Sequence, residues 1–187
     1  MQLSSEQRAA VLGLARSLIR DALEGKRPAL PKQIDEFLLQ PAGCFVSLHT
    51  LAGGRLRGCV GRIDATHALA EALRSSSVHV LQDPRFTHEP VRADELSMLE
   101  LEVSVLSPAR PVESPLEFDP LEHGIYLTFG GRSGCFLPQV ARETGWTREQ
   151  LLDRLCIEKL GLPHTTWRHS QARLSVFGVI VVGPEPF

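Results

Sequence analysis

The residues best suited to chemistry centre on Cys59, within the sequence Leu-Arg-Gly-Cys-Val-Gly at 56–61. If this stretch is a β-strand, side chains alternate between its two faces, so Arg57, Cys59 and Gly61 share one face. A guanidinium beside the thiol would favour the thiolate, which is the nucleophilic and metal-binding form of cysteine. Gly58 and Gly61 would let a ligand approach the backbone closely, or would permit a β-bulge. The stretch therefore predicts a site with Cys59 as the candidate catalytic residue and Arg57, Gly58 and Gly61 as candidate ligand-binding residues.

The same stretch has a structural alternative, in which Cys59 is a small half-buried side chain on a strand interrupted by glycine. Free cysteine is among the residue types most often buried. A nucleophilic Cys59 would also need a base within hydrogen-bond reach. Of the seven histidines, His49 and His67 are the best placed, because His49 lies on the preceding predicted strand and His67 follows the motif closely. Either could instead be a solvated or capping residue.

Three arginines are candidates for holding an anion. Arg57, Arg85 and Arg132 each lie beside glycine or proline, where a loop can present a guanidinium to a carboxylate or phosphate. Ser133 follows Arg132 within Gly-Arg-Ser-Gly. Because loops often carry function on a scaffold, we expect Arg57, Cys59, Arg85, Arg132 and Ser133 to converge on one cleft that accepts a small anionic or nucleotide-like ligand. Alternatively, the arginines are surface residues that form ion pairs with nearby carboxylates.

The composition excludes several classes of protein. Of the 187 residues, 43% are hydrophobic and 22% are charged, which is typical of one globular domain, with room for two lobes, and not of a disordered chain. The net charge of −2 supplies no general basic field for nucleic acid, although a local arginine surface could still bind RNA or a nucleotide. The chain shows neither a signal-peptide pattern at its start nor an apolar run of bilayer length, so we expect a soluble, cytoplasmic protein without membrane contact.

The cysteine spacing argues against a metal centre. The four cysteines include no Cys-x-x-Cys pair, and the histidines show no spacing typical of metal ligands. We therefore expect no structural zinc or iron–sulfur cluster, no disulfide framework and no cofactor.

The elements that must position these residues follow from periodicity and turn chemistry. A helical stripe begins after a capping box formed by Ser4 and Gln7, and a second capping box, formed by Thr147 and Gln150, predicts the start of a later helix. A hairpin turned at Gly53-Gly54 carries the Cys59 motif on its second strand. The patterns predict helices at 5–25, 66–80, 138–141 and 147–160, and strands at 44–51, 55–60, 99–105, 124–129 and 173–182. The helix at 66–80 would point its positive end toward the region after Cys59. This order favours an α+β fold with a mainly antiparallel sheet flanked by helices.

The motif and seven further blocks resemble the AMMECR family, named for the Alport syndrome, midface hypoplasia, intellectual disability and elliptocytosis chromosomal region protein. Prokaryotic members are called AmmeMemoRadiSam system protein A. The blocks that carry the resemblance lie at 45–48, 56–61, 83–86, 101–108, 131–134, 137–140, 145–146 and 155–156. The resemblance covers nearly the whole chain as a single domain.

The resemblance implies an α+β fold in two lobes, with the cysteine motif near a cleft. It also implies association with a Memo-type protein and a radical SAM enzyme, but no established reaction. Cys44 and Cys135 depart from the family pattern, as does the run ending Lys159-Leu160-Gly161. Three functions stay open: a component that handles a substrate of a modification system, a non-catalytic scaffold for the two partners, and RNA or nucleotide binding.

Overall fold

In the structure, a computed structural model that describes residues 2–187, the strands pair antiparallel and helices flank them. The chain divides into two compact units, one formed by the residues up to Leu106 together with Ile180–Phe187, and the other by Ser107–Val179. Strand β7 (Arg173–Pro186) contributes to both units. The α+β fold predicted from the order of the elements is therefore confirmed.

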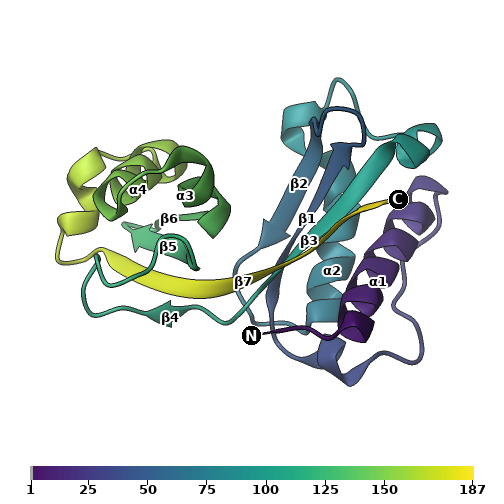
Figure 1. Ribbon diagram of the computed structural model, residues 1–187, viewed down its shortest axis with the longest axis horizontal. Coiled ribbons are helices and arrows are strands. Elements are labelled where there is room, and N and C mark those ends of the chain that lie inside the picture. The colour runs from purple at the N-terminus through teal and green to yellow at the C-terminus, as the bar shows by residue number, and fades with distance from the viewer. Residues whose placement is uncertain (1) are drawn as a thin grey trace. The chain divides into compact units, whose positions relative to one another are not determined.

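The strands of the first unit form the predicted hairpin and its neighbour (Figure 1). They are β1 (Gly43–Thr50), β2 (Leu56–Arg62) and β3 (Leu99–Leu106), in the order β2-β1-β3, followed by β7. Gly53 and Gly54 turn the hairpin with φ of +84° and +61°, which L-residues with a side chain rarely adopt. The turn predicted from the Gly-Gly pair is thus confirmed.

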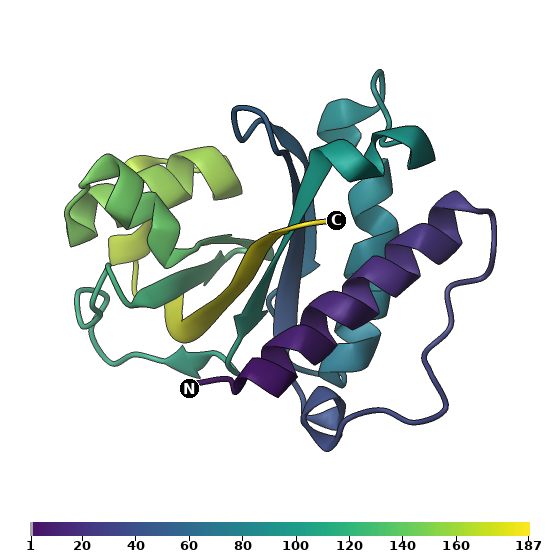
Figure 2. The same cartoon turned by 45° about the vertical axis from the view of Figure 1, so that its right-hand side comes forward.

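Two helices, α1 (Ser5–Leu23) and α2 (Leu69–His79), cover one side of these strands, as Figure 2 shows. The capping box of α1 forms as predicted, with the Gln7 amide donating to Ser4 Oγ at 3.2 Å and the Ser4 amide to Gln7 Oε1 at 2.9 Å. The side chains of β1 and β3 that face these helices are hydrophobic and fully buried, and they form part of the core. They are Cys44, Val46, Leu48, Leu101, Val103 and Val105.

Helix α2 begins three residues later than the sequence pattern predicts. Its N-cap residue, Ala68, has no capping side chain, and the Leu69 amide instead donates to the Gln40 carbonyl at 2.9 Å. At Gly58 of the cysteine motif, the end of α2 that approaches the strand is the C-terminal one. There the Val80 carbonyl packs against Gly58.

Short helical turns connect the long elements of the first unit. The connection before β1 contains η1 (Glu36–Leu39). Between α2 and β3 the chain forms η2 (Val80–Gln82), η3 (Pro84–Phe86) and η4 (Ala93–Met98). The acidic residues that contact β2 lie beside or in these turns: Asp83 precedes η3, Glu89 follows it and Glu95 lies in η4.

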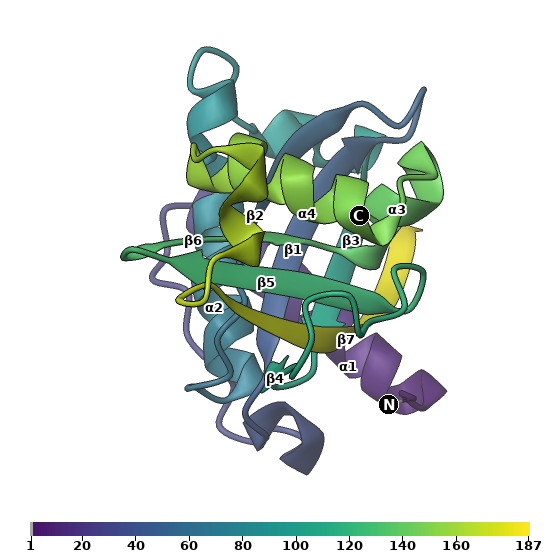
Figure 3. The ribbon, with the colours of Figure 1, turned by 90° about the vertical axis from the view of Figure 1, so that its left-hand side faces the viewer.

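The second unit contains a second hairpin with helices on one side of its strands (Figure 3). Its strands are β4 (Arg110–Pro111), β5 (His123–Phe129) and β6 (Arg132–Phe136), together with the first half of β7. Its helices are α3 (Pro138–Thr144), α4 (Arg148–Leu155), η5 (Cys156–Leu160) and η6 (His164–Arg168). The helix predicted to end at Leu160 ends in five π-helical residues, and its capping box of Thr147 and Gln150 is confirmed.

Across residues 2–187, no helix combines the length and apolar character needed to cross a bilayer.

Candidate functional site

Cys59 belongs to a row of side chains on the face of the first unit's strands that points away from α1 and α2. The register places Cys59 opposite Ser47 of β1, and Ser47 opposite Glu102 of β3. His49 lies two residues along β1 on the same face. The Cys59 thiol is free and partly exposed. The row thus brings a thiol, a hydroxyl, an imidazole and a carboxyl to one sheet face.

Asp83 organises the backbone around Cys59, from a position 24 residues further along the chain. Its carboxylate accepts hydrogen bonds from the Cys59 amide at 2.9 Å and from the Arg85 amide at 3.0 Å. It also accepts from Arg85 Nε at 3.0 Å and Nη2 at 2.6 Å. The Arg85 guanidinium and, to a smaller extent, the two amides lower the pKa of this buried carboxyl to about 2. Asp83 therefore fixes both the Cys59 strand and Arg85.

Arg85 is the guanidinium that lies beside Cys59. Its Nη2 donates to the Cys59 carbonyl at 3.1 Å, and its pKa is raised chiefly by Asp83 and to a smaller extent by Cys59. The side chain is nevertheless 57% exposed. The hydrogen bonds to Asp83 and to the Cys59 carbonyl use Nε and Nη2 of Arg85 and do not use Nη1. The arrangement holds a cation rigidly beside a thiol and leaves one edge of that cation open to solvent.

Arg57 is placed differently from the prediction that it shares a face with Cys59. The register skips a residue, with Leu48 opposite Gly58 and His49 opposite Leu56, so Arg57 is the extra residue of a bulge and simple alternation fails there. Its side chain is 5% exposed and binds Glu95, with Nε to Oε2 at 3.2 Å and Nη2 to Oε1 at 3.0 Å. The local partner of the Cys59 thiol is consequently Arg85.

Both glycines of the motif are explained by close packing. A Cβ atom on Gly58 would lie 2.6 Å from the Val80 carbonyl oxygen. One on Gly61 would overlap the Cys44 carbonyl oxygen and lie 2.5 Å from Phe45 Cα. Neither position tolerates a side chain without moving backbone, so each glycine has a structural role that requires no ligand.

Arg132 and Ser133 lie in the second unit, at the start of β6. Arg132 Nη1 donates to the Leu160 and Gly161 carbonyls at 2.9 and 3.1 Å, so it caps the C-terminal end of η5. Both residues line a cavity of about 310 Å³ beside Tyr126. That these two residues share a cleft with Cys59 stays a prediction.

The other thiols have different surroundings. Cys44 is fully buried with Sγ 3.7 Å from Ser76 Oγ, and burial raises the pKa of its thiol to about 12. Burial also raises the pKa of Cys156, whereas Cys135 is partly exposed on β6. The residues from 2 to 187 hold no cluster of three or more histidine, cysteine, aspartate or glutamate side chains suited to a metal ion.

Neither Asp83 nor Glu95 was predicted from the sequence as a site residue. The signal for Asp83 was present, since Asp-Pro-Arg is a common start of a short helical turn in which the aspartate caps the amides that follow. No local signal indicates that Arg57 binds Glu95, 38 residues away.

Comparisons with known proteins give matches that cover most of the chain. The sequence model of the family described as AMMECR1 matches residues 12–182. A protein of Nanoarchaeum equitans is 38% identical over 88% of this chain and 93% of its own length, and one of Methanothermobacter thermautotrophicus is 35% identical over 94% and 93%. The crystal structure of an uncharacterised protein from Pyrococcus horikoshii has a TM-score of 0.85 and 31% identity, and the match covers 97% of this chain and 93% of that one.

Proposed function

The chain belongs to the AMMECR1 family, and on this premise we propose that it is the protein A component of the AmmeMemoRadiSam system and binds a small anionic or nucleotide-like ligand beside Cys59. Its partners in this proposal are a Memo-type protein and a radical SAM enzyme. The resemblance of the motif blocks to the family supports a place in this system and association with these two partners. The geometry around Cys59 supports the ligand.

The observation that carries the ligand proposal is the anchored but exposed guanidinium of Arg85. Asp83 holds Nε and Nη2, so a ligand does not have to order a flexible side chain when it binds. The open Nη1 can donate a charge-assisted hydrogen bond to a phosphate or carboxylate oxygen. Ser47 and Cys59 offer further polar groups on the same face.

A second candidate function, nucleophilic catalysis by Cys59, is favoured by the position of His49. The two residues are diagonal neighbours across β1 and β2, a spacing of about 7–8 Å between backbones that an imidazole can bridge. Within residues 2–187, however, no histidine or carboxylate is hydrogen-bonded to Cys59 Sγ. We therefore place ligand binding first and a base-assisted nucleophile second.

Ligand binding is tested by thermal unfolding in the presence of pyrophosphate, adenosine monophosphate and uncharged adenosine. A ligand at 100 times its Kd adds about 2.7 kcal/mol to the stability of the folded state. For a domain of this size we expect the two anions to raise Tm by roughly 5–10 °C at that concentration, and adenosine to leave it unchanged.

The matched variants are Arg85→Gln, which removes the charge but keeps a polar side chain for Asp83, and Arg27→Ala, which removes an exposed arginine from the connection before η1. We expect the anion effect to vanish in Arg85→Gln and to persist in Arg27→Ala. Equal shifts in both variants, or no shift in the unmodified protein, would contradict the proposal and favour a non-catalytic scaffold.

A further inference from the structure

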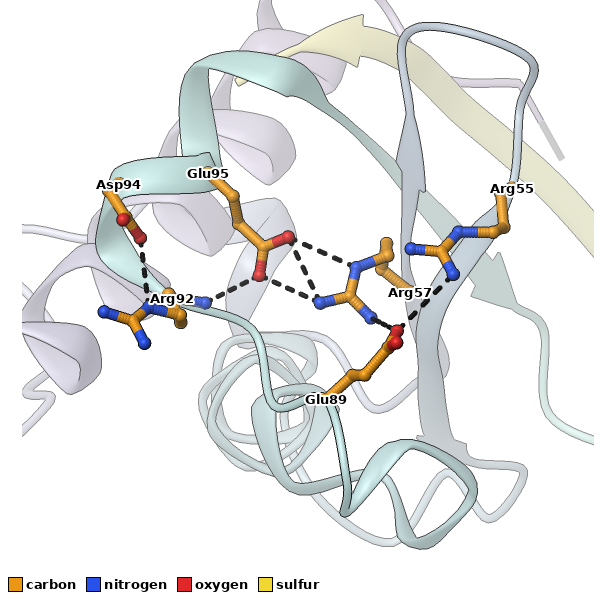
Figure 4. Close-up of polar contacts among 6 residues, drawn as sticks. All are labelled: Arg55, Arg57, Glu89, Arg92, Asp94 and Glu95. Carbon is orange, nitrogen blue, oxygen red and sulfur yellow. Dashed lines mark hydrogen bonds and ion pairs between the residues drawn. The ribbon is translucent and has the colours of Figure 1, made fainter.

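We propose that Arg57 forms the base of a second binding site, separate from the Cys59 face, which accepts the uncharged carbonyl oxygen of an amide. The inference does not depend on the proposed function, because it uses a different arginine and a different cavity. Figure 4 shows the residues that build this site: Arg57 from β2, Arg92 and Glu89 from the segment between η3 and η4, and Asp94 and Glu95 from η4.

The Arg57 guanidinium is held in place on one edge only. Glu95 accepts hydrogen bonds from Nε and Nη2, and its Oε1 also accepts from the Arg92 amide at 2.7 Å. The Glu95 carboxylate is thus bound both to the Arg57 guanidinium and to the Arg92 backbone amide, and the Arg57 side chain is buried. The position of the remaining nitrogen, Nη1, is consequently well defined.

Nη1 of Arg57 is a buried donor without an acceptor among the residues that the structure describes. Its nearest anionic neighbour is Glu89 Oε2 at 3.8 Å, which is an ion-pair distance and too long for a hydrogen bond. Glu89 is 65% exposed and is shared with Arg55, so it does not saturate Nη1. A buried donor left unpaired is costly, which indicates that an acceptor from outside the chain completes the site.

The cavity that Arg57 lines has the size of a small-molecule site. It measures about 450 Å³, and Arg57 lines it together with Glu89, Arg92, Asp94 and Glu95. Pro90 and Met98 supply an apolar wall, and Met98 is 59% exposed. A ligand that reaches Nη1 would therefore place an alkyl group against Met98.

The charges of the lining favour an uncharged acceptor over an anion. Each carboxylate of the lining is paired with a guanidinium: Glu95 with Arg57, Asp94 with Arg92, and Glu89 with Arg55, which lies outside the lining. A carboxylate or phosphate would meet three carboxylates here and no guanidinium that lacks a carboxylate partner. An amide carbonyl satisfies Nη1 without adding charge.

Isobutyramide and isobutyrate test the inference, because they match in shape and differ in charge. We expect isobutyramide to cause saturable NMR shifts of the Arg57 side-chain N–H signals and of the backbone amides of residues 88–95. Isobutyrate at the same concentration should bind at least fivefold more weakly.

Three variants separate a site from a structural cluster. Met98→Ala should weaken isobutyramide binding severalfold, whereas Leu39→Ala, which removes an exposed apolar side chain that does not line the cavity, should not. Arg57→Lys should abolish the shifts at residues 88–95. If Arg57→Lys does not fold, Met98→Ala still tests the site, because its own spectrum shows whether that variant is folded. The inference is overturned if isobutyramide causes no saturable shift, if isobutyrate binds as tightly, or if Met98→Ala and Leu39→Ala behave alike.

Discussion

Replacing Gly61 by alanine is expected to destabilise the fold by about 3 kcal/mol, the upper part of the range for overpacked sites. The added Cβ would overlap the Cys44 carbonyl oxygen and lie 2.5 Å from Phe45 Cα. Both contacts are with the backbone of β1, which cannot move away because β1 is paired on its other side with β3. Urea unfolding of the variant measures the loss directly.

Gly13→Ala is the matched control, because nothing lies within 4 Å of a Cβ atom at that position in α1. Alanine should stabilise the middle of this helix by about 0.5–1 kcal/mol. If Gly61→Ala proved as stable as Gly13→Ala, the close packing of β2 on β1 would be refuted, and a ligand-binding role for Gly61 would regain support.

Replacing Asp83 by asparagine is expected to cost about 2 kcal/mol of stability at pH 7. The pKa of Asp83 is lowered to about 2, against about 3.9 for an unfolded aspartate, and the side chain is 3% exposed. A carboxyl whose pKa is depressed by folding contributes stability above its unfolded pKa and loses that contribution as the pH falls through the folded pKa. The stability difference between wild type and Asp83→Asn should therefore be full above about pH 4 and disappear near pH 2.

Asp64→Asn provides the comparison for this prediction. Hydrogen bonds from Arg62 and Thr66 also lower the pKa of Asp64 to about 2, but its side chain is 49% exposed. Solvent screens such a pair, so the substitution should cost less than about 1 kcal/mol. Equal costs for the two substitutions in urea titrations from pH 7 to pH 2.5 would count against Asp83 as the residue that fixes Cys59 and Arg85.

Much of the fold follows from local patterns in the chain. The capping boxes at Ser4 and Thr147 and the glycine turn at Gly53-Gly54 depend on neighbouring residues only, and all three form as expected. The start of α2 was missed because a carbonyl from a distant segment, that of Gln40, supplies its cap. Such a tertiary contact leaves no mark in the local sequence.

The candidate site was less predictable than the fold, because long-range partners determine it. Alternation predicted a shared face for Arg57 and Cys59, but the bulge at Arg57 interrupts the alternation, and Glu95 binds the guanidinium. The convergence of Asp83 and Arg85 on Cys59 required the chain between β2 and β3 to fold back over β2. The residue types indicated which side chains could bind a ligand or react. Which of these side chains lie together is seen only in the tertiary structure.

The rate at which iodoacetamide alkylates Cys59, resolved from the other cysteines by mass spectrometry, tests the central claim most directly. Cys44 serves as the internal control, because it is fully buried with a thiol pKa of about 12 and should not react in the folded protein. We expect pyrophosphate to slow alkylation of Cys59 in the unmodified protein and to have no effect in Arg85→Gln. A rate at Cys59 that pyrophosphate leaves unchanged, or protection that persists in Arg85→Gln, would contradict an anion site formed by Arg85 beside Cys59.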